Sequence, residues 1–138
     1  MIVTKSFQTQ TKGDGQVIEI NGEVCNQVTD SGVSEGIVTV FVTGTTAGVI
    51  IMEHEPGLVE DLDAAMERLV PRGIPYQHNI RNNDDNGHSH TRACLLGPSL
   101  VVPVAQRRPL LGVWQRIVLV DFDSRPRQRD VIVQVMGE

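Results

Sequence analysis

The chain has 138 residues with a formal net charge of −5, and 40% of its residues are hydrophobic. This length and composition are typical of one globular domain, here residues 1–138, and the excess of acidic side chains argues against a nucleic-acid partner. No apolar run reaches the ~18 residues of a membrane span and the N-terminus does not resemble a secretory signal, so we expect a cytoplasmic protein with no membrane partner.

Alternating and β-branched residues predict about seven strands. In chain order they fall at about residues 1–10, 17–20, 36–43, 49–53, 99–104, 112–121 and 130–136. A first helix is expected after the second strand, at 22–30 between an Asn21 cap and Gly32. A second helix follows the fourth strand, at 58–69, with apolar residues at helical spacing and an end before Pro71. These elements predict an α+β fold, a sheet-rich β-sandwich or flattened barrel with two helices.

Residues 72–92 form a long polar segment, which we expect to be a loop that is either functional or disordered. His88 and His90 would point to the same face if this segment were extended, and His78 could join them. Three neutral imidazoles with an open position are typical of a catalytic zinc site, although nickel, copper and iron also accept imidazole. The alternative interpretation is that these histidines belong to a solvated loop.

Two polar residues follow or interrupt apolar strands. Glu53 closes the strand expected at 49–53 and could act as a general base on metal-bound water, or it could be an exposed loop acid. Gln115 follows Trp114 and would need a hydrogen-bond partner if it were buried. We interpret Glu53 as a candidate catalytic residue and Gln115 as a candidate substrate-binding residue. The two cysteines, Cys25 and Cys94, are expected to be buried, reduced thiols.

Other candidates for substrate binding would hold an anionic group. Thr45 and Thr46 lie in a glycine-flanked turn whose hydroxyl and backbone N–H groups could cradle an anion, and Ser99 adds a hydroxyl in a similar turn. Arg127 belongs to a cluster with Arg125 and Arg129 that could hold a phosphate or pair with acidic neighbours. The alternatives are plain turns and a solvated strand edge.

Several motifs carry a resemblance to a known family. They are Gly44-Thr45-Thr46-Ala47, Glu53, Tyr76-Gln77-His78, Asn86-Gly87-His88-Ser89-His90, Leu95-Leu96-Gly97-Pro98-Ser99, Leu111-Gly112-Val113-Trp114-Gln115 and Asp121-Phe122-Asp123-Ser124-Arg125-Pro126-Arg127. In this order, along nearly the whole chain, they resemble the YjbQ-like family, whose members are often described as secondary thiamine-phosphate synthases.

The resemblance implies an α+β sandwich that forms a homotrimer, with a histidine-lined metal cleft that in several members lies at a subunit junction. It also implies weak synthesis of thiamine phosphate from a thiazole phosphate and a pyrimidine pyrophosphate. His78 and His90 match the family's histidines, whereas Gly44 stands where many members have histidine, and Met52 and His54 replace asparagines beside Glu53.

We therefore expect His78, His88 and His90 to bind a divalent metal, with zinc as the first candidate. In this hypothesis His88 supplies the imidazole that is absent at position 44. The substrate would be a small phosphorylated molecule. The alternative is a non-catalytic, metal- or ligand-binding homotrimer.

Overall fold

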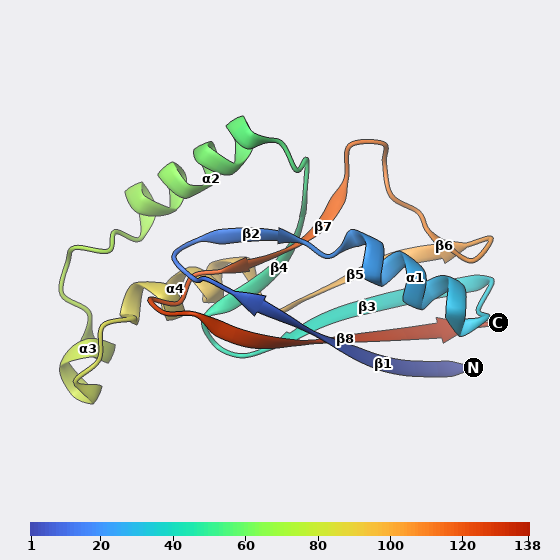
Figure 1. The fold of residues 1–138 in the computed structure, drawn as a ribbon, viewed down its shortest axis with the longest axis horizontal. Helices are drawn as coiled ribbons and strands as arrows, with labels where there is room; N and C mark the ends of the chain where they lie inside the picture. The colour runs from blue at the N-terminus through green and yellow to red at the C-terminus, as the bar shows by residue number, and fades with distance from the viewer.

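Eight strands and four helices make up the computed structural model, which describes residues 1–138 (Figure 1). In chain order they are β1 (Ile2–Thr11), β2 (Gln16–Glu19), α1 (Asn21–Ser31), β3 (Glu35–Thr43), β4 (Ala47–Met52), α2 (Pro56–Leu69), α3 (Gln77–Asn82), α4 (Gly87–Leu96), β5 (Ser99–Ala105), β6 (Arg108–Pro109), β7 (Arg116–Asp121) and β8 (Arg127–Gly137). The expected sheet-rich α+β fold is confirmed.

The larger sheet has five antiparallel strands in the order β1-β8-β3-β5-β6. Buried and more exposed residues alternate along its central strands, because every second side chain points to the same face of the sheet. In β8, Val131, Val133 and Val135 are buried. The residues paired with them in the neighbouring β3, among them Val38 and Val40, are buried as well. The last strand of the chain thus lies between the first strand and the third.

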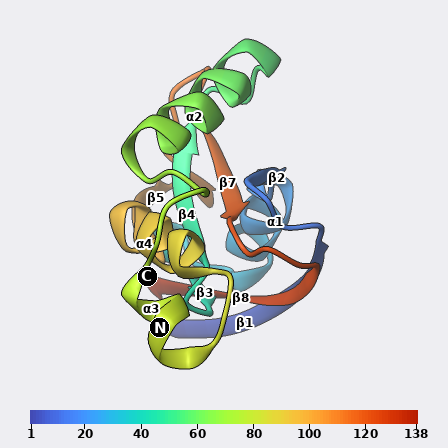
Figure 2. The same cartoon turned by 90° about the vertical axis from the view of Figure 1, so that its left-hand side faces the viewer.

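The smaller sheet, β2-β7-β4, packs on the valine face of the larger one. One face of β7 contributes Ile117 and Leu119 to this shared core, which is completed by Val24 and Val28 of α1. The opposite face of β7 contributes Val118 and its neighbours to a second core with α2 and α4. Figure 2 shows α2 and α4 on one side of this sheet and α1 on the other. The layers are therefore sheet, sheet and helices.

The structure differs from the expected pair of helices, since α3 and α4 occupy the segment expected to be a loop. No apolar stripe marks α4, because it buries polar side chains that have partners inside the fold. Arg92 donates to the Val70 carbonyl and to Glu67, and Ser89 Oγ donates to the Phe122 carbonyl. Hydrophobic periodicity cannot identify a helix whose buried face is polar.

Two further expectations need correction. The strand expected at 112–121 begins only at Arg116, because residues 112–115 form a turn in which the Gln115 side chain accepts from the Gly112 N–H at 2.7 Å. Cys94 is exposed on α4, whereas Cys25 is half-buried, and burial raises the pKa of its thiol. None of the four helices combines the length and hydrophobicity required to cross a membrane.

Candidate functional site

Five segments that are distant in sequence meet at one end of the sandwich. They are the end of β1, the β3–β4 turn, the start of α4, the end of β7 and the start of β8. A cavity of 430 Å³ opens there, and no hydrophobic residue lines it. Its lining residues are Gly44, Thr45, Thr46, Asp84, Asn86, His90, Asp123, Arg127, Gln128 and Arg129. We call this the polar cavity.

A buried ion pair forms the floor of the polar cavity. Arg129 Nε lies 2.7 Å from Asp121 Oδ2, and Arg129 Nη2 lies 3.0 Å from Asp121 Oδ1, so the contact is bidentate. Thr11 Oγ1 also donates to Asp121, at 2.6 Å. Asp121 is 0% exposed and Arg129 is 6% exposed. Each charge is therefore held away from water by the other.

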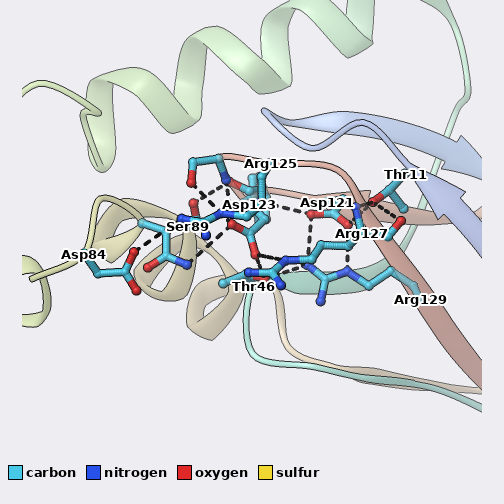
Figure 3. Close-up of polar contacts among 12 residues, drawn as sticks. Thr11, Thr46, Asp84, Ser89, Asp121, Asp123, Arg125, Arg127 and Arg129 are labelled. Carbon is cyan, nitrogen blue, oxygen red and sulfur yellow. Dashed lines mark hydrogen bonds and ion pairs between the residues drawn. The ribbon is translucent and has the colours of Figure 1, made fainter. Parts of the chain in front are cut away.

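Asp123 connects this pair to the cavity wall (Figure 3). Thr46 Oγ1 donates to it at 2.9 Å, and Arg127 Nε donates at 2.8 Å. Burial would by itself raise the pKa of Asp123, but hydrogen bonds from Thr46, Arg127 and the Ser124 backbone outweigh it and lower this pKa to about 2. Asp123 is therefore ionised at neutral pH and holds both the threonine and the arginine in place.

The two arginines keep unused N–H groups at the cavity. The side chain of Arg127 donates to protein only through Nε, and the side chain of Arg129 donates only through Nε and Nη2. A Cβ at Gly44 would lie 2.7 Å from Arg129 Nη1, so glycine leaves this nitrogen uncovered. Asn86, 4% exposed, also has an unpaired Oδ1. These groups can recognise an oxyanion that also carries a hydrogen-bond donor.

His78 and His90 form a pair at the edge of the polar cavity. Their ring centroids lie 4.3 Å apart, and His78 Nδ1 is buried without a hydrogen-bond partner. Burial, followed by the nearby His78, lowers the pKa of His90, which favours the neutral imidazole that binds metals. The two imidazoles therefore lie next to each other at this edge.

The third expected ligand, His88, lies elsewhere. Residues 88 and 90 are on a helix, where positions two apart face roughly 200° from each other. His88 is 6% exposed and lies against Tyr76, with ring centroids 6.4 Å apart. Burial, and then Arg92, lowers its pKa. No three His, Cys, Asp or Glu side chains of this chain are arranged to hold a metal ion, so a three-histidine centre does not fit here.

The other predicted residues divide between the two ends of the fold. Thr45, Thr46 and Arg127 line the polar cavity, whereas the exposed Ser99 starts β5 and does not. Glu53 follows β4, and Thr46 precedes it, so a six-residue strand of about 20 Å separates them.

Glu53 lines a separate 290 Å³ cavity with Trp114 and Arg116. The exposed Gln115 lines a third cavity, beside α1, and not the polar cavity.

Sequence reasoning assigned no role to three central residues, Asn86, Asp121 and Asp123, and it named Arg129 only as a member of the arginine cluster. A signal was present, because Asp121 and Asp123 precede Arg127 and Arg129 with matching spacing across a short turn. Two pairs of opposite charge so close together can neutralise each other inside the fold. The arginine cluster was considered only as a phosphate site, a partner for acids or a solvated edge.

Comparisons with known proteins cover the whole chain. The family model described as UPF0047 protein YjbQ-like matches residues 5–138. A UPF0047 protein of Methanothermobacter thermautotrophicus is 35% identical over 137 residues, which are 99% of this chain and 94% of that protein. One of Archaeoglobus fulgidus is 45% identical over 102 residues, covering 74% of this chain and 79% of the relative.

Solved structures agree with these matches. The hypothetical protein APE1520 of Aeropyrum pernix K1 superposes with a TM-score of 0.91 at 37% identity, covering 99% of each chain. A YbjQ-like protein of unknown function from Sulfolobus solfataricus P2 gives a TM-score of 0.90 at 30% identity, covering 100% of each chain.

Proposed function

Because the chain belongs to the YjbQ-like UPF0047 family, we propose that it is a metal-dependent enzyme acting on a small phosphorylated substrate, whose phosphate binds in the polar cavity. The observation that carries this proposal is the set of unused N–H groups of Arg127 and Arg129 in a cavity without hydrophobic lining. His78 and His90 would supply two ligands to a divalent metal, for which zinc is the first candidate. The metal would add positive charge beside the phosphate.

The reaction that the family resemblance implies suits this arrangement. The thiazole nitrogen attacks the methylene carbon that joins the pyrimidine ring to pyrophosphate; a C–N bond forms, and the C–O bond breaks with its electron pair passing to pyrophosphate. Arg127 and Arg129 donate hydrogen bonds to the leaving oxygen as its charge grows. Because Asp121 and Asp123 hold both guanidinium groups in place, little reorganisation is required when that charge develops.

Phosphate binding tests the first step. Arg127→Gln is expected to weaken inorganic phosphate binding by about tenfold or more, because a charge-assisted hydrogen bond is lost. Isothermal titration calorimetry measures this effect. The matched control is Arg125→Gln, because Arg125 pairs with Asp84 and Asp85 but does not line the cavity. Equal affinity in all three proteins would contradict the assignment of the phosphate site.

Glu53, the candidate catalytic residue, can contact a substrate in the polar cavity only if a second copy of the chain brings it there. The outer face of the larger sheet supports self-association, since Ile2, Met136 and Ile37 lie side by side in register and are exposed. The Trp114 loop beside Glu53 is also uncovered, with Trp114 70% exposed. We take a homotrimer as the assembly.

Subunit mixing tests this arrangement. Glu53→Ala and His90→Ala chains are each expected to be inactive alone, and to regain thiamine-phosphate formation after they are unfolded and refolded together. Light scattering should give three times the chain mass of 15.2 kDa. If the mixture remains inactive while wild-type protein treated in the same way is active, Glu53 does not act across chains.

The second candidate is a non-catalytic, ligand-binding homotrimer. It is favoured by the distance between Glu53 and the polar cavity, because no other carboxylate near the cavity is free of an ion pair or a hydrogen bond. Phosphate binding without any product formation in the presence of zinc would support this candidate over the enzyme.

A further inference from the structure

A second, smaller cavity of 190 Å³ borders the polar cavity, and its wall is almost entirely apolar. Its lining residues are Gly44, Thr45, Ala47, Ala93, Cys94 and Pro98. They come from the β3–β4 turn, the second half of α4 and the turn that precedes β5. We call this the apolar slot.

Gly44 and Thr45 line both spaces, so the β3–β4 turn is their common border. A Cβ at position 44 would lie within 2.7 Å of Arg129 Nη1, at the point where the two spaces adjoin. The absence of a side chain there leaves the arginine nitrogen on one side of the border and the apolar wall on the other. The two spaces therefore meet at this turn.

The geometry points to a ligand that spans both spaces: a phosphate monoester whose ester group is a short, uncharged hydrocarbon chain. This inference rests on the proposed function for the phosphate end, and it adds the chemical class of the opposite end. The apolar slot contains no charged residue to neutralise a charged tail, and burying an unpaired charge is costly. The small volume of the slot limits the tail to a few carbons.

A series of alkyl phosphates measures the contribution of the slot. Inorganic phosphate and methyl, ethyl, propyl and butyl phosphate are titrated into the protein by calorimetry. Each buried methylene is expected to tighten binding by about fourfold, until the slot is full and the affinity stops rising. A charged analogue of the same length, 2-aminoethyl phosphate, should bind no better than methyl phosphate.

Cys94 offers a variant pair, because it is exposed and its replacement does not disturb the core. Cys94→Phe should fill the slot and abolish the gain with chain length, while inorganic phosphate affinity stays within about twofold. Cys94→Ser keeps the size of the side chain and should preserve the chain-length series. A thermal melt of each variant confirms that it is folded.

The Cys94 thiol also provides a direct readout in the wild-type protein. Butyl phosphate should slow alkylation of Cys94 by iodoacetamide, as mapped by mass spectrometry, whereas inorganic phosphate should not. Cys25, which is half-buried, should react at the same slow rate in every sample.

The outcomes separate the two proposals. If no phosphate binds, alkylated or not, both the proposed function and this inference are overturned. If inorganic phosphate binds but chain length has no effect on affinity, or if Cys94→Phe leaves the series unchanged, only the spanning ligand is overturned.

Discussion

Replacing Asp121 by alanine is expected to lower the free energy of unfolding by about 3–5 kcal/mol. The change would leave Arg129, which is 6% exposed, as a buried cation without its carboxylate. Thr11 would also lose its acceptor. Urea denaturation followed by far-ultraviolet circular dichroism measures the effect. Tryptophan fluorescence is the poorer probe, because Trp114 is already 70% exposed in the folded protein.

Two variants control this result. Arg125→Ala removes an arginine whose partners, Asp84 and Asp85, are on the surface, and should cost less than about 1 kcal/mol. The double change of Asp121→Leu with Arg129→Met removes both charges and should recover most of the stability lost by Asp121→Ala. A loss below about 1 kcal/mol for Asp121→Ala would mean that water reaches the pair.

His90→Ala is expected to weaken zinc binding by more than the ~10–100-fold typical of changes to groups that only support a metal ligand. The reason is that His78 and His90 form the one pair of imidazoles in the chain with adjacent rings, 4.3 Å apart. Competition with a chromogenic zinc chelator at pH 7.5 measures the affinity. His78→Ala should have a similar effect.

His88→Ala gives the sharpest control, because it removes a histidine two positions away on the opposite face of α4. We expect its zinc affinity to stay within about tenfold of wild type. Its stability should fall by about 1–3 kcal/mol, because a buried ring that contacts Tyr76 and lies 3.4 Å from Ser89 Oγ is lost. If His88→Ala lost zinc and His90→Ala kept it, the assignment of the metal to His78 and His90 would be wrong.

The strands and two helices of the fold could be predicted because their physical signal is local. Valines at every second position of β3 and β8 directly indicate strands with one buried face. In the same way, Pro56 and the apolar stripe that follows it indicate the helix α2. The two-residue strand β6 has no such pattern, since it consists only of Arg108 and Pro109. The helix α4 was missed because Ser89 and Arg92, both buried, satisfy their hydrogen bonds with partners far away in sequence.

The candidate site was predictable only in part for a related reason. Thr45, Thr46 and Arg127 were identified because hydroxyl and guanidinium groups in turns are natural anion ligands. Asp121 was not identified as the partner of Arg129, because the two become a buried pair only after β7 and β8 converge on one end of the fold. Glu53 was grouped with the histidines because sequence order does not reveal that β4 carries it to the opposite end.

The position of β8 has a consequence for folding. β8 pairs with β1 on one side and β3 on the other, and it also supplies Arg127 and Arg129. Since more than a hundred residues separate the paired positions of β1 and β8, the larger sheet forms through contacts between distant parts of the chain, and long-range pairing of this kind is slow. Until β8 docks, β1 and β3 have exposed edges, through which a partly folded chain can aggregate.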